Sequence, residues 1–152
     1  FKNSRNASHC VSFMSKMEDC IFCKIVNGKI PSAMVYEDAK VIGFLDIMPA
    51  NKGHCLVLPK KHAQNLIEVG EDDLIALMKA AKKIARALSL SVGNGSFNIV
   101  MNNGKEAGQL INHAHIHIIP RFHKDRLRLK WSHLKYEGNE IKEYAEKIMK
   151  FI

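Results

Sequence analysis

The chain has 152 residues, of which 47% are hydrophobic and 25% charged, and this is the composition of a globular domain long enough to bury a core. No apolar run approaches the roughly 20 residues of a transmembrane helix, so we expect no membrane span. The formal net charge of +8 favours anionic partners. A positively charged protein suits a nucleotide ligand as well as a nucleic acid. Because many of the basic residues are also scattered along the chain, we do not expect nucleic-acid binding.

Cysteine usage and the first residues bear on the compartment and on the domain boundary. The four cysteines are few for a disulfide scaffold and favour a reducing compartment, the cytoplasm or the nucleus. Residues 1–16 are basic, rich in Ser and Asn, and free of acidic residues. That composition is typical of a disordered tail, a cloning remnant or an organellar targeting segment. We expect residues 17–152 to form a single domain with a C-terminal tail.

Apolar periodicity and turn residues divide the chain into elements. Helical spacing predicts a short helix over residues 18–27, a long one over 71–90 and an amphipathic one within 138–152. Apolar runs bounded by Gly, Pro or Asn predict strands at 35–36, 41–45, 55–58, 97–101 and 112–119. Hairpin-joined strands with helices between them predict an α+β fold: an antiparallel sheet of about five strands with one long helix packed on it.

Three histidines alternate with apolar residues in the last predicted strand, at His113, His115 and His117. They should share one face, because alternate side chains of a strand point the same way. The residues alone leave three interpretations: a surface row on an edge strand, a metal-binding face, or a site for nucleotidyl transfer. For transfer, a neutral imidazole with its pKa of about 6.5 is a nucleophile near neutral pH, and its neighbours can stabilise phosphate charge and protonate a leaving group.

A second cluster of candidate ligands is the Cys-x-x-Cys pair of Cys20 and Cys23. This spacing is a common half of a tetrahedral zinc site. The same spacing also serves redox chemistry, a disulfide or simple packing. Cys55 lies inside an apolar strand and is expected to be a small core residue.

In order and spacing, several motifs resemble the histidine-triad (HIT) superfamily, and its Hint-like branch in particular. The resemblance covers about residues 19–121 and includes Gly108-Gln109 before the histidine row and Ile119-Pro120-Arg121 after it. It also includes the segments Cys20-Ile21-Phe22-Cys23-Lys24-Ile25, Phe44-Leu45-Asp46-Ile47, Gly53-His54 and Leu58-Pro59-Lys60-Lys61-His62.

The resemblance implies a role for each matching position. His115 would be the nucleophile, His117 and His54 would contact the phosphate and assist the leaving group, and His113 would complete the catalytic row. Asp46 would bind the ribose hydroxyls, and Asn102 and Gln109 would help to hold the phosphate. An apolar slot for the base would be formed by Ile21, Phe22, Ile25, Phe44 and Ile47.

The resemblance also implies a structural zinc ion held by Cys20, Cys23, His62 and His113, no organic cofactor, and a homodimer formed through the long helix and the adjoining sheet edge. One position departs from the pattern. Leu110 stands where Hint-like enzymes often have a polar residue such as Ser, and its side chain cannot donate a hydrogen bond to the phosphate or the leaving group.

The function implied by the resemblance is hydrolysis of purine nucleoside phosphoramidates, of the adenosine 5′-monophosphoramidate type, through a nucleotidyl-histidine intermediate. Two alternatives remain open. One is hydrolysis of dinucleoside polyphosphates, which uses the same histidine row. The other is a regulatory or scaffolding module that binds nucleotides with little turnover, and Leu110 keeps this alternative open.

Overall fold

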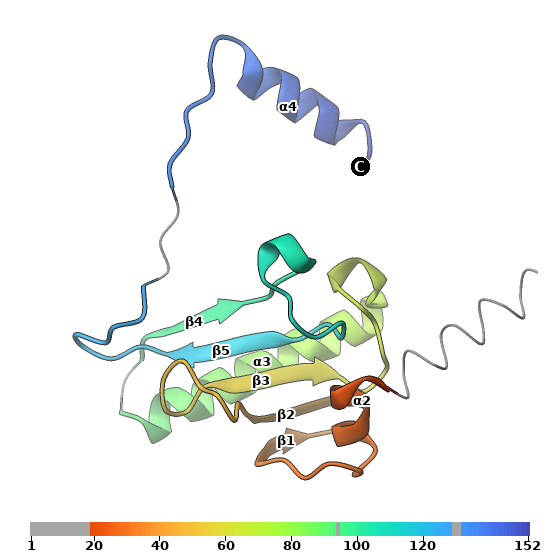
Figure 1. Cartoon of the computed structure of the whole chain (residues 1–152), viewed down its shortest axis with the longest axis vertical. Coiled ribbons are helices and arrows are strands. Elements are labelled where there is room, and N and C mark those ends of the chain that lie inside the picture. Colours follow the sequence, from red (N-terminus) through yellow and green to blue (C-terminus); the bar gives the residue numbers. More distant parts are fainter. Residues whose placement is uncertain (1–18, 94, 129–131) are drawn as a thin grey trace, which may run out of the picture.

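A computed structural model describes residues 19–93, 95–128 and 132–152 of the chain (Figure 1). Residues 1–16, predicted to be a tail or a remnant, and Cys10 lie outside the described residues. In chain order the elements are α2 (Ile21–Val26), β1 (Met34–Glu37), β2 (Val41–Leu45), β3 (Cys55–Pro59), the short 3₁₀ turn Leu66–Glu68, α3 (Glu71–Ser91), β4 (Phe97–Val100), the 3₁₀ turn Lys105–Ala107, β5 (Ile116–Pro120) and α4 (Glu140–Met149).

The five strands form one sheet in the order β1-β2-β3-β5-β4, and every neighbouring pair is antiparallel. The first three strands follow one another as hairpins, whereas α3 and β4 are inserted between β3 and β5 in the sequence. The predicted α+β class, the strand count and the long helix are therefore confirmed.

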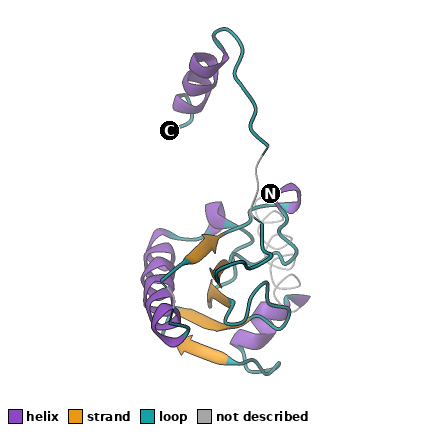
Figure 2. Cartoon of the chain, turned by 90° about the vertical axis from the view of Figure 1, so that its left-hand side faces the viewer, coloured by secondary structure: helices purple, strands orange, loops and turns teal. Residues whose placement is uncertain are grey.

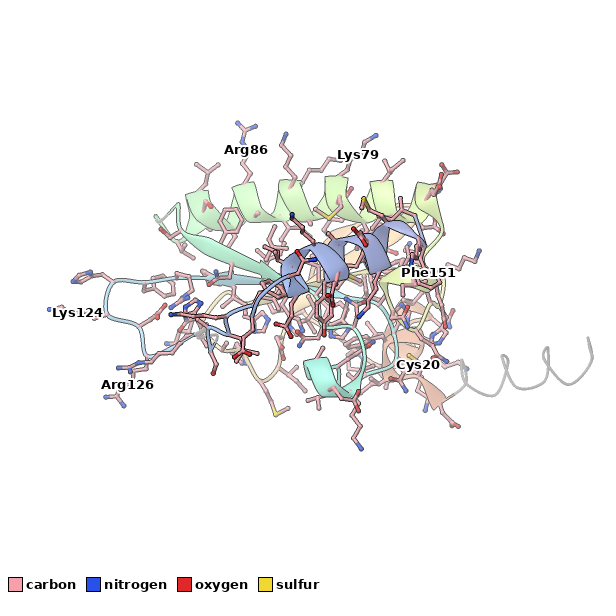
Figure 3. The ribbon with its side chains drawn as sticks, turned by 90° about the horizontal axis from the view of Figure 1, so that it is seen from above. Cys20, Lys79, Arg86, Lys124, Arg126 and Phe151 are labelled. Carbon is pink, nitrogen blue, oxygen red and sulfur yellow. The ribbon has the colours of Figure 1, made fainter. Side chains whose placement is uncertain are left out.

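Helix α3 covers one face of the sheet (Figure 2). It begins after Gly70 with three acidic residues, which favour the positive end of the helix dipole. Its buried stripe packs on inward-facing residues of β2, β3 and β5, and consists of Leu77, Ala80, Ala81, Ile84, Ala85 and Leu88. On its opposite side Lys79 and Arg86 point away from the sheet (Figure 3).

The other face of the sheet carries a second apolar cluster: Phe22, Ile42, Phe44, Leu56 and Leu58. Along β3 the side chains alternate between the two faces, since Val57 packs under α3 while Leu56 and Leu58 pack beside Phe22 of α2. Cys55 is buried under α3, which confirms the prediction that it is a core residue.

Helix α3 packs closely against the sheet at Gly43 in β2. A Cβ atom placed there would lie 2.6 Å from Cδ1 of Ile84 and 3.5 Å from the Leu56 carbonyl oxygen. Glycine avoids an overlap with Ile84 at this position, which a larger residue could escape only if Ile84 shifted.

The last strand differs from its predicted range of 112–119, because β5 begins only at Ile116. The amide of Ala114 donates to the Ala63 carbonyl, in the loop that precedes α3, and the amide of His113 donates to Ile111. Both bonds are made outside the sheet, so His113 and His115 lie in an extended approach to β5. Only His117 belongs to the strand.

The C-terminal helix predicted within residues 138–152 is confirmed as α4, which stands away from the sheet in Figure 1 and buries none of its residues. Among the described residues, no helix combines the length and the apolar character that crossing a membrane requires.

Candidate active site and metal centre

The histidine row lies on the sheet face opposite α3. His117 pairs with Leu56 of β3 and so shares the face of the Phe22 cluster. Ala114, Ile116 and Ile118 are buried on the other side. The rings of His115 and His117 have centroids 4.8 Å apart, and Phe22 packs edge-on against the rings of His113 and His115. The predicted alternation therefore places the three imidazoles in one row.

The hydrogen bonds of His115 define its tautomer. Its Nδ1 lies 2.6 Å from the backbone carbonyl oxygen of His113. A carbonyl only accepts, so Nδ1 carries the hydrogen and donates it. The lone pair of the neutral ring is then on Nε2, and this nitrogen is the nucleophilic atom of the side chain.

His54 and His117 form a hydrogen-bonded pair beside His115. The amide of Ala50 donates to Nδ1 of His54 at 3.2 Å, so the hydrogen of neutral His54 is on Nε2. That Nε2 lies 3.0 Å from Nδ1 of His117 and donates to it. The hydrogen of His117 is consequently on Nε2. The carboxylate of Asp46 lies 3.6 Å from Nδ1 of His54.

Burial keeps these imidazoles neutral at pH 7. Desolvation is the main cause that lowers the pKa of His54 and of His115, and it lowers the pKa of His117 to about 4. Charge repulsion between neighbouring rings adds to the shift at His117, while the Asp46 carboxylate opposes it. At neutral pH the three rings therefore carry lone pairs rather than positive charge.

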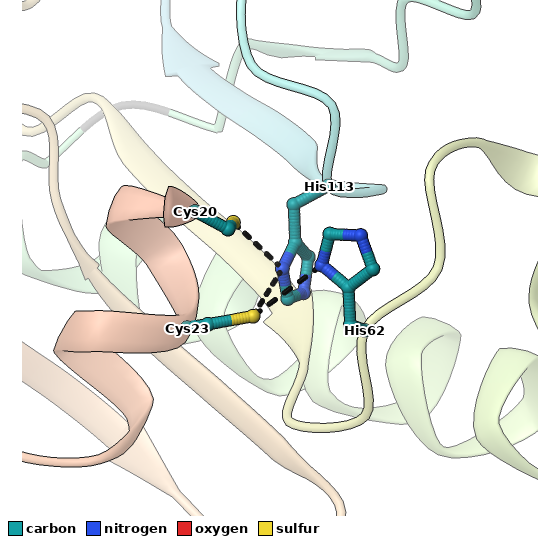
Figure 4. Close-up of side chains that lie close together, drawn as sticks. All are labelled: Cys20, Cys23, His62 and His113. Atoms are coloured by element: carbon teal, nitrogen blue, oxygen red, sulfur yellow. Dashed lines mark hydrogen bonds between the residues drawn. The ribbon is translucent and has the colours of Figure 1, made fainter. Parts of the chain in front are cut away.

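The second cluster brings together Cys20, Cys23, His62 and His113, at a position near the N-terminus of α2 (Figure 4). Sγ of Cys23 lies 3.3 Å from Nδ1 of His62 and 3.6 Å from Nδ1 of His113, and Sγ of Cys20 lies 3.5 Å from Nδ1 of His113. The described cysteines form no disulfide. Burial, with the nearby Cys20 as a smaller cause, raises the pKa of the Cys23 thiol to about 12.

These residues fit a tetrahedral cation. Zinc bonds of about 2.3 Å to sulfur and 2.0–2.1 Å to nitrogen, at tetrahedral angles, separate sulfur and nitrogen ligands by about 3.6 Å. The measured separations of 3.3–3.6 Å match that value. Nε2 of His113 lies 2.8 Å from the Pro59 carbonyl and donates to it, which leaves the Nδ1 lone pair directed at the sulfurs. The cluster can therefore hold a metal ion.

His113 belongs to both clusters. Its ring faces the cysteines, and its backbone carbonyl orients the ring of His115. The side chain is completely buried. His113 therefore orients His115 through its main chain, while Nδ1 of its ring is directed at the cysteines.

The residues predicted to bind the base are divided between the core and the surface. Phe22 and Phe44 are buried in the cluster around α2, and Ile25 packs against it. Ile21 is half-exposed and Ile47 is 90% exposed. Ile47 follows Asp46, whose carboxylate accepts from the amide of Met48 at 2.9 Å. Three of the five residues thus belong to or pack against a buried apolar cluster, and the other two side chains are accessible.

The amide of Gln109 is already engaged in hydrogen bonds. Nε2 donates to the carbonyls of Gln64 and Ile111, and Oε1 accepts from the amide of Gly104. Asn102 donates to the Gly108 carbonyl at 3.4 Å. Both residues shape the turn that leads into the histidine row. Leu110, the position that differs from the Hint-like pattern, is 92% exposed.

Several groups that organise the site were absent from the sequence-based prediction. The carbonyls of Pro59 and His113 and the amide of Ala50 set the tautomers, and no side-chain pattern indicates a backbone group. Arg121 donates to Asp125 through Nε and Nη2, and Asn51 joins them by donating to Asp125. This network fixes the end of β5. The sequence identifies Arg121 as part of the Ile119-Pro120-Arg121 motif but does not predict its partners.

The comparisons with known proteins agree with this geometry. Residues 27–124 match the HIT domain family. The chain is 50% identical over 116 residues to an uncharacterized HIT-like protein of Methanocaldococcus jannaschii, covering 76% of this chain and 89% of that one. It is 38% identical over 130 residues to an adenosine 5′-monophosphoramidase of Schizosaccharomyces pombe, covering 85% and 95%. The chain belongs to the HIT family.

Solved structures resemble the fold closely. A HIT family protein from Bacillus subtilis superposes with a TM-score of 0.83 at 41% identity, covering 88% of this chain and 97% of that one. A zinc-bound histidine triad family protein from Mycobacterium smegmatis superposes with a TM-score of 0.70 at 32% identity, with the same coverage of 88% and 97%.

Proposed function

We propose that the protein hydrolyses nucleoside 5′-phosphoramidates of the adenosine monophosphoramidate type, releasing the nucleoside monophosphate and an amine. The observation that carries the proposal is the tautomer of His115. Because Nδ1 donates to the His113 carbonyl, Nε2 presents a lone pair beside His117 and His54. A buried, neutral and oriented imidazole is an effective nucleophile.

The reaction takes two displacements. Nε2 of His115 attacks the α-phosphorus, a nitrogen–phosphorus bond to the enzyme forms, and the bond to the leaving nitrogen breaks. The departing nitrogen needs a proton, which the His54–His117 pair supplies. A phosphate anion beside these rings favours their charged form and so raises the pKa that burial had lowered. Water then attacks the phosphorus, the pair takes up a proton from it, and His115 leaves in its neutral form.

Substrate binding is proposed for the remaining predicted residues. The Asp46 carboxylate accepts from the ribose hydroxyls, and the base lies over the apolar floor of Phe22 and Phe44 between Ile21 and Ile47, with Ile25 behind the floor. Gln109 and Asn102 position the turn, and we propose that the half-buried amide of Asn102, which donates to the Gly108 carbonyl, also contacts the phosphate.

We propose zinc as the ion of the Cys20–Cys23–His62–His113 cluster. Two sulfurs and two nitrogens complete a tetrahedral shell, so the ion has no open position and serves structure rather than catalysis. The zinc-bound relative from Mycobacterium smegmatis supports the assignment. Elemental analysis of the purified protein should give one zinc per chain.

A homodimer is proposed on the exposed side of α3 and the edge strand β4. Met78, Phe97 and Ile99 line a groove of about 320 Å³ there, together with Ala85 and two basic side chains. These three apolar side chains are 38–47% exposed in the single chain. Sedimentation at several concentrations, with Met78→Glu as the disrupting variant, tests the dimer.

The function is tested by measuring AMP release from adenosine 5′-monophosphoramidate and from diadenosine triphosphate in parallel. We expect turnover of the phosphoramidate that is abolished in His115→Ala, with AMP binding retained. Faster turnover of diadenosine triphosphate would replace the proposed substrate class with the dinucleoside polyphosphates. AMP binding without turnover of either substrate would overturn the hydrolase proposal and leave a nucleotide-binding module.

A further inference from the structure

A second group of possible metal ligands lies beside His115 and contains no sulfur: Asp46, His54 and His117. Ligand atoms of the three side chains all lie within 4.8 Å of one another. His54 occupies the middle, with one ring nitrogen 3.0 Å from His117 and the other 3.6 Å from the Asp46 carboxylate. The group shares no residue with the cysteine cluster.

The chemistry of the three side chains selects one class of ion. Two imidazoles and one carboxylate suit borderline divalent ions such as Zn²⁺, whereas Mg²⁺ and Ca²⁺ prefer shells built from oxygen. His54 is buried and held in place by Ala50, so its ring is already oriented. Asp46 keeps 18% of its side chain exposed, so an ion and a solvent ligand can reach the group.

We propose that Asp46, His54 and His117 bind a zinc-class divalent ion. The ion replaces the proton that His54 donates to His117. Each ring contributes one nitrogen, and Asp46 contributes one oxygen. If Nε2 of His54 is the ligand, its proton moves to Nδ1 and the hydrogen bond from Ala50 is given up. Three protein ligands leave a fourth position open, unlike the closed shell of the cysteine cluster.

Such an ion inhibits the enzyme, and this consequence rests on the proposed function. It lies between Nε2 of His54 and Nδ1 of His117, so it blocks the passage of a proton from His54 to His117, and the pair cannot replace the proton given to the leaving group. It also engages the carboxylate that holds the ribose. Free zinc-class ions and the nucleotide therefore compete for the same side chains, and AMP weakens the binding of the second ion.

The test counts ions on the full chain without nucleotide. Protein already holding one Zn²⁺ per chain is titrated with Zn²⁺ in a calorimeter, and with Co²⁺ followed by visible absorption. We expect one further ion per chain, and a Co²⁺ spectrum without the sulfur charge-transfer band that a cysteine site gives. Asp46→Asn should weaken this second site at least tenfold, since it removes one of three ligands, and Asp72→Asn on α3 should leave it unchanged.

Circular dichroism shows whether each variant is folded, and His117→Ala provides a second ligand deletion if Asp46→Asn is not. A wild-type chain that binds no second ion overturns the proposal, as does a second ion that survives both deletions. Addition of AMP separates the two proposals. If the second ion binds but AMP does not affect its affinity, the metal site stands and the proposed placement of the nucleotide is wrong.

Discussion

Replacement of Gly43 by alanine tests the close packing of α3 on the sheet. The added methyl carbon would lie 2.6 Å from Cδ1 of Ile84, about 1 Å closer than the roughly 3.5–4.0 Å at which carbon atoms attract. Ile84 is itself buried, so its terminal methyl has little room to move. Overpacking of this kind costs about 1–3 kcal/mol, and the reduced entropy of the unfolded chain offsets about 0.4–1 kcal/mol of that cost.

We therefore expect Gly43→Ala to lower the free energy of unfolding by about 0.5–2 kcal/mol, which is a fall of about 2–6 °C in Tm for a chain of this size. The measurement is urea denaturation at fixed protein concentration. Gly95→Ala is the matched control, because a Cβ atom there meets nothing within 4 Å. It should be neutral or slightly stabilising.

Ile84→Val identifies the clash as the cause. This change removes the methyl group that the new alanine would meet. In the double variant, β2 gains one methyl group and α3 loses one, so the packed volume between helix and sheet is conserved. Alone, Ile84→Val should cost about 0.5–1.5 kcal/mol. In the double variant we expect the two costs to cancel in large part. Additive losses, or a Gly43→Ala protein as stable as the wild type, would refute the packing argument.

Three further predictions concern the metal cluster, the titration of the row and Leu110. Chelation of the metal, or Cys23→Ser, should lower Tm, and Cys55→Ser should not alter metal content; an unchanged Tm in metal-free protein would contradict the structural role. The pKa of His117 falls from 6.5 to about 4 on folding, so the unfolded chain binds more protons between these values and stability drops as pH falls from 6.5 to 4. This histidine accounts for at most about 3 kcal/mol of that drop. In His117→Gln, the urea concentration at the unfolding midpoint should therefore depend less on pH than it does in the wild type. Leu110→Ser should raise kcat/KM for the unsubstituted phosphoramidate about tenfold. The reason is that the serine hydroxyl supplies one hydrogen bond, worth about 1.4 kcal/mol in the transition state. Equal kcat/KM values for the two proteins would mean that position 110 does not touch the reacting groups.

The sequence was sufficient to predict the sheet and its principal helix, because both depend on apolar periodicity. The run from Val41 to Leu45 and the long helix over residues 71–90 could be assigned from the pattern alone, and the structure confirms both elements. Alternation also placed His117 correctly. The same rule assigned His113 to the strand too early, because the bond from Ala114 to Ala63 is a loop contact that no local pattern encodes.

Within the site, sequence indicated the side chains but not the groups that orient them. The cysteine pair and two distant histidines could be joined only by resemblance, and the structure brings them within bonding range of one ion. The tautomers of His54 and His115 depend on backbone groups of Ala50 and His113, which every residue type provides equally. The high exposure of Ile47 likewise depends on the path of a loop rather than on residue type.

The two roles of His113 lie in different parts of one residue, and this separation has an evolutionary consequence. Its ring belongs to the metal cluster, whereas the carbonyl that orients His115 belongs to the main chain. A descendant that lost the cysteines and replaced this histidine would lose a ligand but retain the carbonyl, provided that the backbone kept its course. The proposed metal site and the proposed nucleophile can therefore diverge independently, and a relative without the cysteine cluster still has the carbonyl that orients the histidine at position 115.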